Sequence, residues 1–299
     1  MSAFRSLLTR SYAMATTPVR WIWATSAKAS NRYPIVVLNY HRVSDTSPGE
    51  KTIATADFSR QLEWLSKNFD MVSLQEVQKR INGGIDRPTA AITFDGGYAD
   101  NSLMALPLLV KQQIPATYFV NSESVLRDKE LPSDSSDHQS LQGNGIESLQ
   151  LLEQSGIEIG SQGKSLTDLG KVNAPETLFE EVVDARDELE TYLEKPIRYF
   201  SFPLGTHESL NDEVFRLAKR FGFDGVCSAY GGYNEIGGDS FHLHRIPADP
   251  CFDRFRCGTS LDPRMSFRRR YPTPDLMRIT NERERRKEVR SEIRSSEIG

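Results

Sequence analysis

The sequence contains few cysteines, and their arrangement excludes two kinds of covalently or metal-stabilised fold. Only Cys227, Cys251 and Cys257 occur in 299 residues. An odd number of cysteines cannot be fully paired in disulfides, and the spacing does not match a zinc finger. We therefore expect neither a disulfide scaffold nor a structural zinc site, and we interpret the three cysteines as packed or reduced thiols.

Long hydrophobic runs are missing as well. No stretch approaches the roughly 18 consecutive apolar residues that can cross a bilayer, so the sequence predicts no transmembrane segment. The body of the chain also lacks an excess of positive charge, because residues 1–263 contain 26 Lys or Arg and 35 Asp or Glu. Nucleic acids bind clustered cations, so this acidic body argues against nucleic acid as a partner.

The two ends of the chain differ from this body. The first 33 residues contain five cationic residues and no acidic residue. They resemble a targeting presequence but lack the apolar core of a secretory signal, so we predict a loosely attached basic N-terminal arm over residues 1–33. Residues 263–299 alternate in charge without an apolar face, which predicts a helical or disordered tail. Residues 34–262 are then long enough for one large domain.

Short apolar runs alternate with segments of helical period in this central region. Such alternation is typical of β/α units arranged around a parallel sheet. Seven strand candidates lie between Pro34 and Pro247, within the segments PIVVLNYHR, TAAITFD, PATYFV, IEIGS, IRYFSFP, DGVCSA and FHLHRIP. One α/β domain built as a β/α barrel fits this pattern better than two small domains do.

Ligand-binding side chains of a parallel barrel gather where its strands end. Polar candidates at such positions are His41, Asp95, Gln162, Arg198, His242 and His244. Asp95 begins the turn DGGY, and Asp at that position can simply support a turn. His41 could equally be a hydrogen-bonded histidine at the sheet edge. The pair of histidines in FHLHRIP points to one face and could form a metal site with His207.

Several motifs, taken in order, resemble one known family. The segments NYHRVSD, ITFDGGYADN, IPATYFV, IEIGSQGKSLTDL, RYFSFPLG and HRIP are similar to those of the polysaccharide deacetylase, or NodB-homology, family. The resemblance implies a distorted barrel of seven β/α units that removes N- or O-acetyl groups from glycans with a divalent metal, usually zinc. It also implies an acetylated polysaccharide or oligosaccharide as the partner, and it leaves the oligomeric state open.

The resemblance assigns roles to individual residues. Asp95 matches the catalytic base of the family, and His41 matches a histidine that acts as general acid. The residues that match the groove motif of the family, or lie beside its motifs, are Arg198, Phe200, Pro203, Gly205 and Tyr98. Aromatic rings suit such a groove because the faces of sugars stack on them.

The metal positions of the family do not match this sequence. Gly96 replaces an aspartate ligand, while Gln162 and Leu166 replace two histidine ligands. Because zinc sites use imidazole, thiolate or carboxylate donors, we expect no bound cofactor. The sequence thus predicts a catalytically impaired pseudo-deacetylase that binds carbohydrate or acts as a scaffold. The alternatives are an active hydrolase of amide or ester bonds in acetylated sugars that uses Asp95 and His41, or an interaction protein working through the charged tail.

Overall fold

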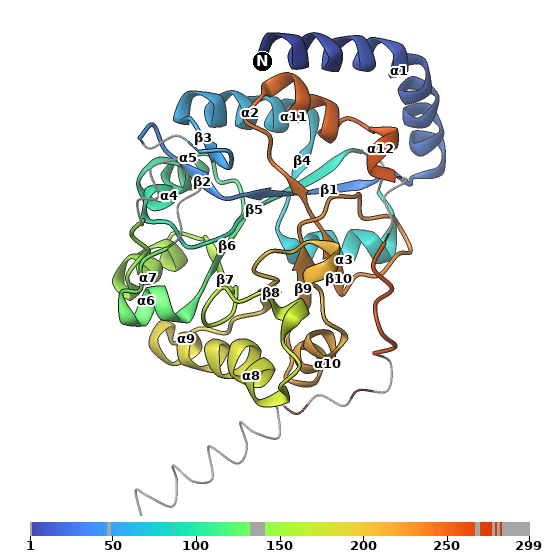
Figure 1. The fold of residues 1–299 in the computed structure, drawn as a ribbon. Coiled ribbons are helices and arrows are strands. Elements are labelled where there is room, and N and C mark those ends of the chain that lie inside the picture. Colours follow the sequence, from blue (N-terminus) through green and yellow to red (C-terminus); the bar gives the residue numbers. More distant parts are fainter. Residues whose placement is uncertain are drawn as a thin grey trace, which may run out of the picture.

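The computed structural model describes residues 2–46, 49–85, 87–131, 141–266, 270–276, 279 and 282. Its centre is a parallel sheet with the strand order β10-β9-β8-β7-β6-β5-β1-β11 (Figure 1). These strands are β1 (Ile35–Tyr40), β5 (Thr89–Phe94), β6 (Ala116–Val120), β7 (Glu158–Ser161), β8 (Tyr199–Ser201), β9 (Gly225–Ser228), β10 (His242–His244) and β11 (Ile246–Pro247). A short strand β4 (Asp70–Met71) pairs with β5, and β2 (Arg42–Val43) pairs with β3 (Thr52–Ile53) in a separate sheet.

The last two strands close the sheet into a barrel. Strand β10 pairs with β9, whereas β11 pairs with β1 at the other edge. Only Arg245 separates β10 from β11, so one short stretch of chain reaches both edges. The prediction of a distorted seven-unit β/α barrel is confirmed, because β1 and β5–β10 correspond to the seven strand candidates.

The side chains of each strand alternate between two buried layers. In β1, Val36, Leu38 and Tyr40 belong to a large apolar cluster that includes side chains of the surrounding helices. Ile35 and Val37 belong to a smaller cluster shared with other strands and with helix α3. The side chains that face inward fill the interior of the barrel. Only inward-facing side chains near the ends of the strands can therefore reach a site at the mouth of the barrel.

Helices connect most of the strands, as the periodicity predicts. They are α2 (Thr55–Asn68), α3 (Leu74–Gly83), α4 (Ala99–Met104), α5 (Leu106–Lys111), α6 (Ser122–Arg127), α7 (Ile146–Gln154), α8 (Pro175–Phe179), α9 (Ala185–Leu193), α10 (Asp212–Arg220), α11 (Phe252–Thr259) and α12 (Pro263–Ser266). Helices α8 and α9 are joined by a π-helical turn, Glu180–Asp184. Two short 3₁₀ turns cover Leu169–Lys171 and His207–Ser209.

The N-terminal arm is a helix, α1 (Ser2–Ser30), which lies outside the barrel next to α11 (Figure 1). The Tyr12 hydroxyl donates a hydrogen bond to Oδ1 of Asp262 at 2.9 Å. Arg20 Nη1 donates to the carbonyl of Ser260 at 2.9 Å. These specific contacts differ from the loose attachment that the composition predicted, because a side chain's partner in a distant segment cannot be read from local charge.

The start of the C-terminal tail packs against the barrel. The ring of Tyr271 stacks on Phe215 at 5.7 Å, and its hydroxyl donates to Asp212 at 2.7 Å. Residues from 283 onward lie outside the described part of the chain, and so does most of the tail for which we predicted helix or disorder.

A histidine pair on β10 lies beneath this tail segment. Nδ1 of His242 is 3.2 Å from the Thr273 hydroxyl, and its Nε2 is 2.9 Å from the Ser228 hydroxyl. Nδ1 of His244 is 3.0 Å from the Tyr230 hydroxyl, and the two imidazole rings are 4.4 Å apart. Burial lowers the pKa of His242 well below its ordinary value, and burial also lowers the pKa of His244, to about 4.

These depressed pKa values predict acid sensitivity of the fold. The unfolded chain takes up protons at these histidines near pH 6.5, whereas the folded chain resists protonation until a lower pH. Their contribution to stability is therefore complete above pH 6.5 and is lost as the pH falls towards about 4. We expect the free energy of unfolding in urea to fall by up to about 3 kcal/mol through His244 alone. His244→Asn should flatten this dependence, and an unchanged slope in that variant would contradict the assignment.

Candidate active site

The two residues that match the catalytic pair of the family lie at the carboxyl-terminal edge of the barrel. Asp95 follows β5 and is 1% exposed. Its backbone N–H donates to the Tyr40 carbonyl at 2.8 Å, which places His41 beside it on the neighbouring strand. The His41 carbonyl accepts a hydrogen bond from Nδ2 of Asn101 at 2.7 Å. Adjacent parallel strands thus bring together two residues that are 54 positions apart in the sequence.

A buried arginine holds the Asp95 carboxylate. Nη1 of Arg245 donates to Oδ1 at 2.7 Å, and Nη2 donates to Oδ2 at 2.8 Å. The Ser201 hydroxyl donates to Oδ1 at 3.1 Å and accepts from Nη2 at 2.7 Å. The guanidinium is fully buried and also donates to Thr93 and to the Ser228 carbonyl. Both carboxylate oxygens are therefore engaged in a bidentate, charge-assisted pair.

The HRIP motif contains Arg245, but the sequence pattern alone predicts no role for this residue. The signal that could have found it is the polarity of Asp95, since a carboxylate at a buried strand end needs an opposite charge. Its position between β10 and β11 directs the guanidinium across the barrel, where it also lies 5.2 Å from the ring of Phe119.

Gly96 adopts a backbone conformation that leaves no room for a side chain. Its φ of +96° lies in a region that L residues rarely adopt. A Cβ atom placed there would overlap the ring of Tyr98. The half-buried Tyr98 side chain thus occupies the space next to Gly96. Two glycines follow the strand-end carboxylate because the turn has a positive φ at both Gly96 and Gly97.

Gln162 links the ends of three strands. It follows β7 and is 1% exposed. Its Oε1 accepts from the backbone N–H of Gly96 at 2.8 Å, and its Nε2 donates to the Pro203 carbonyl at 3.4 Å. Both ends of the amide are consequently used within the protein.

The loop after Gln162 is organised by Glu181. Oε2 of this buried carboxylate accepts the backbone N–H groups of Lys164 at 2.8 Å and Ser165 at 3.1 Å. Leu166 follows with a φ of +60° and a half-buried side chain. Within the described residues, no three His, Cys, Asp or Glu side chains are grouped so that they could hold a metal ion. The hypothetical site of His207, His242 and His244 is therefore not found there either.

Two of the predicted groove residues do not join Asp95. Arg198 precedes β8, and its Nε donates to Glu158 at the start of β7 at 2.8 Å, so it lies at the opposite end of the barrel. Phe200 is fully buried in the outer apolar cluster, where its ring lies 5.9 Å from Phe223. Strand alternation explains this placement, because the neighbouring Ser201 faces inward towards Asp95.

Pro203 and Gly205 do lie beyond the end of β8, near a cavity. Gly205 has a φ of +61°, and its carbonyl accepts from the Ala229 N–H at 2.7 Å. The cavity measures about 620 Å³ and is lined by Thr206, His207, Glu208, Ala229, Tyr230, Gly231, Ile246, Pro247 and Met265. These residues follow β8, β9 and Arg245, so the cavity opens at the same end of the barrel as Asp95.

An imidazole forms one wall of this cavity. The ring of His207 lies 5.7 Å from Tyr230 and 5.4 Å from Tyr271. Its Nε2 is buried and has no hydrogen-bond partner among the described residues. Tyr230 had no role in the sequence analysis, because only the fold brings the ends of β8 and β9 together with the tail.

The fold defines a protein of the NodB type, a distorted parallel α/β barrel. A Streptococcus pyogenes deacetylase, PplD in complex with acetate, has the same fold, with a TM-score of 0.64 and 20% sequence identity over 76% of this chain and 98% of that chain. IcaB from Ammonifex degensii gives a TM-score of 0.62 and 21% identity over 76% of this chain and 97% of the other.

Sequence comparisons agree with this class. Residues 82–226 match the family model described as polysaccharide deacetylase. The putative polysaccharide deacetylase YxkH of Bacillus subtilis (strain 168) is 24% identical over 233 residues, which cover 76% of each chain. The chain is thus similar to the polysaccharide deacetylase family over residues 82–226.

The ion pair of Asp95 and Arg245 predicts a large effect of removing one partner. Arg245→Met should cost about 3–5 kcal/mol of unfolding free energy, because it leaves a buried carboxylate without its cation. The double variant Asp95→Asn/Arg245→Met should recover part of this loss. Urea unfolding of the unmodified protein, the single variants Asp95→Asn and Arg245→Met, and the double variant measures the coupling between the two residues. A cost below about 1 kcal/mol for Arg245→Met would contradict a structural role of the pair.

The contact of Gly96 with Tyr98 predicts a second coupling. Gly96→Ala should be destabilising both by its positive φ, at about 1–2 kcal/mol, and by overlap with the Tyr98 ring. Adding Tyr98→Ala should remove the overlap and leave only the backbone cost. Thermal or urea unfolding tests this cycle. Equal costs of Gly96→Ala with and without Tyr98 would show that the ring does not fill this space.

Proposed function

We propose that this protein binds an acetylated polysaccharide or oligosaccharide, or acts as a scaffold on it, without the metal-dependent hydrolysis that the family resemblance implies. One observation carries the proposal. At the positions that the resemblance assigns to metal ligands, the ring of Tyr98 fills the space beside Gly96, and the Gln162 amide is hydrogen-bonded within the protein.

The residues present do not fit a zinc ion. Zinc in proteins takes nitrogen, thiolate or carboxylate donors, and catalytic sites commonly use three. Gly96 and Leu166 have no donor atom in their side chains, and the amide oxygen of Gln162 already accepts from Gly96. These positions therefore offer no ligand set for a metal-dependent step.

Energetics support the loss of hydrolysis. A bound metal lowers the pKa of water from 15.7 to about 7. Without it, hydroxide formation becomes harder by up to about 12 kcal/mol, at 1.36 kcal/mol per pKa unit. A general base contributes about 10²- to 10⁴-fold, which is far less. Asp95, the base required by the alternative of an active hydrolase, has both oxygens bound to Arg245.

The cavity beside the end of β8 supports carbohydrate binding. Its volume of about 620 Å³ suits a small ligand, which typically occupies about 300–1,000 Å³. Tyr230 and His207 offer flat rings for a sugar face, and Glu208 offers a carboxylate for its hydroxyl groups. Because the Nε2 of His207 is buried, a sugar in the cavity would contact the ring of His207 rather than this atom.

Calorimetry with acetylated chitin oligomers tests this function. The protein treated with a chelator should bind the oligomer as well as the zinc-treated protein, and neither should release acetate. His207→Ala should weaken binding about tenfold, equivalent to about 1.4 kcal/mol. Glu176→Ala, an exposed substitution on α8, is the matched control and should leave the affinity unchanged.

Three results would contradict the proposal. Micromolar, stoichiometric zinc binding with acetate release that stops on chelation would make the protein an ordinary family enzyme. Acetate release without zinc that is lost in Asp95→Asn would establish the alternative hydrolase. Absence of binding to any acetylated oligosaccharide tested would remove the carbohydrate role.

A further inference from the structure

Helix α1 exposes several large apolar side chains. Met14 is 76% exposed, Trp21 68% and Ile22 57%. Trp21 and Ile22 come seven and eight positions after Met14, about two turns further along the helix. Pro18 lies between them inside α1, and the helix bends along its length (Figure 1). Several exposed apolar side chains close together indicate a partner, because the transfer of Trp and Ile side chains out of water is favourable.

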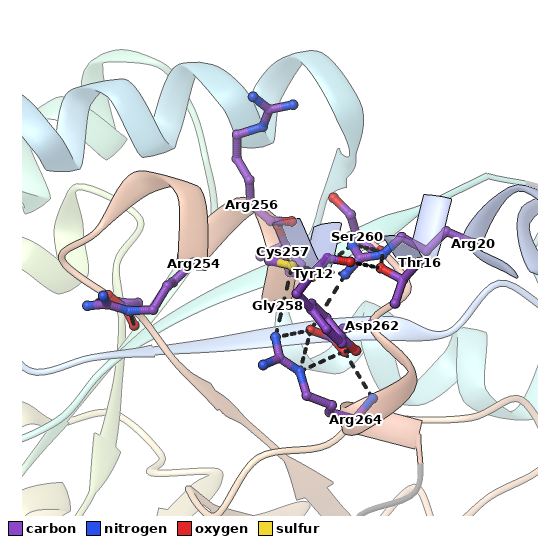
Figure 2. A network of polar contacts seen from close by, with 12 residues as sticks. Tyr12, Thr16, Arg20, Arg254, Arg256, Cys257, Gly258, Ser260, Asp262 and Arg264 are labelled. Carbon is purple, nitrogen blue, oxygen red and sulfur yellow. Dashed lines mark hydrogen bonds and ion pairs between the residues drawn. The ribbon is translucent and has the colours of Figure 1, made fainter. Parts of the chain in front are cut away.

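One side of α1 is attached to the barrel, as Figure 2 shows for Tyr12, Thr16 and Arg20 around Asp262. Nε of Arg20 donates to the Thr16 hydroxyl at 2.9 Å, and its Nη2 lies 3.7 Å from Asp262. The Tyr12 hydroxyl donates to the same carboxylate. These bonds hold this side of the helix against the barrel. Trp21 borders the cavity between α1 and the barrel, whereas Met14 and Ile22 do not line that cavity.

Charge identifies the kind of partner. Residues 1–34 contain Arg5, Arg10, Arg20, Lys28 and Arg32 and no acidic residue, so their formal charge is +5. The whole chain has a formal charge of −4, so the remainder has a charge of −9. A cationic helix with an exposed Trp-containing apolar face suits an anionic lipid surface, where Trp prefers the interface and cations meet phosphate groups.

A cavity beside Trp21 extends the apolar character of this region. It measures about 400 Å³ and lies between α1, the start of β1 and α2. Its lining includes Trp21, Tyr33, Trp64, Phe69 and Tyr233. None of the helices among the described residues is both long and apolar enough to span a membrane. Contact in the plane of the surface is consequently the mode that this helix allows.

We propose that α1 attaches the protein to the surface of an anionic phospholipid bilayer. The Met14, Trp21 and Ile22 side chains enter the boundary between headgroups and acyl chains, and the exposed Lys28 side chain lies among the phosphates. The barrel then stays in water beside the membrane. This inference is independent of whether the cavity near His207 binds a glycan.

Vesicle co-sedimentation of the full chain tests the proposal, with phosphatidylcholine vesicles that contain or lack phosphatidylglycerol. We expect binding to the anionic vesicles, weakened by high salt because surface charges are screened. Trp21→Glu/Ile22→Glu should weaken it by about tenfold or more. The control Leu103→Glu/Leu151→Glu adds the same charge at side chains that are 72% and 65% exposed on α4 and α7, and should bind like the unmodified protein.

Other results would overturn the proposal. It fails if the unmodified protein does not bind anionic vesicles, or if the control variant loses binding as much as Trp21→Glu/Ile22→Glu. It also fails if light scattering finds a dimer that this double variant separates, because a second copy would then cover the face. Met14 does not line the cavity, so Met14→Glu should weaken vesicle binding without changing the melting temperature. This variant keeps the test valid if Trp21→Glu/Ile22→Glu misfolds.

Discussion

The buried ion pair between Asp95 and Arg245 is the interaction on which the mouth of the barrel depends. Arg245 lies between β10, which pairs with β9, and β11, which pairs with β1. Its guanidinium therefore crosses the interior where the sheet closes. A fully buried cation is tolerated only when its donors are satisfied, and Asp95, Ser201, Thr93 and the Ser228 carbonyl accept them. Closure of the barrel and the position of the carboxylate are thus one structural requirement.

This requirement also limits the chemistry of the site. Asp95 directs one lone pair of each carboxylate oxygen to the guanidinium, so only its remaining lone pairs can face a ligand. The neighbouring positions are equally committed, since Tyr98 packs on Gly96 and Gln162 bridges to Pro203. The result is a polar network at this edge of the barrel that joins the ends of β5, β7 and β8.

Two parts of the molecule then remain open to partners, and they differ in chemistry. The cavity near His207 combines aromatic rings with a carboxylate, which suits a polar ligand with flat faces. The outer face of α1 combines aliphatic and indole side chains with a segment free of acidic residues, which suits a lipid surface. In the described part of the chain the two regions lie on different elements, so either role can exist without the other.

The order of apolar runs and helical segments in the sequence was sufficient to determine the parallel barrel, because strand burial and β/α alternation are local properties. It also placed Asp95 and His41 at one edge, since every parallel strand ends on the same side. It could not determine the locations of the Arg198 and Phe200 side chains. These depend on where β8 starts and on which side of the strand each residue faces. Only the tertiary structure decided that Arg245 pairs with Asp95, that Tyr98 fills the space beside Gly96, and that α1 is attached through Asp262. These contacts join segments far apart in the chain, and their energies come from desolvation and packing in three dimensions, which no local pattern of residues records.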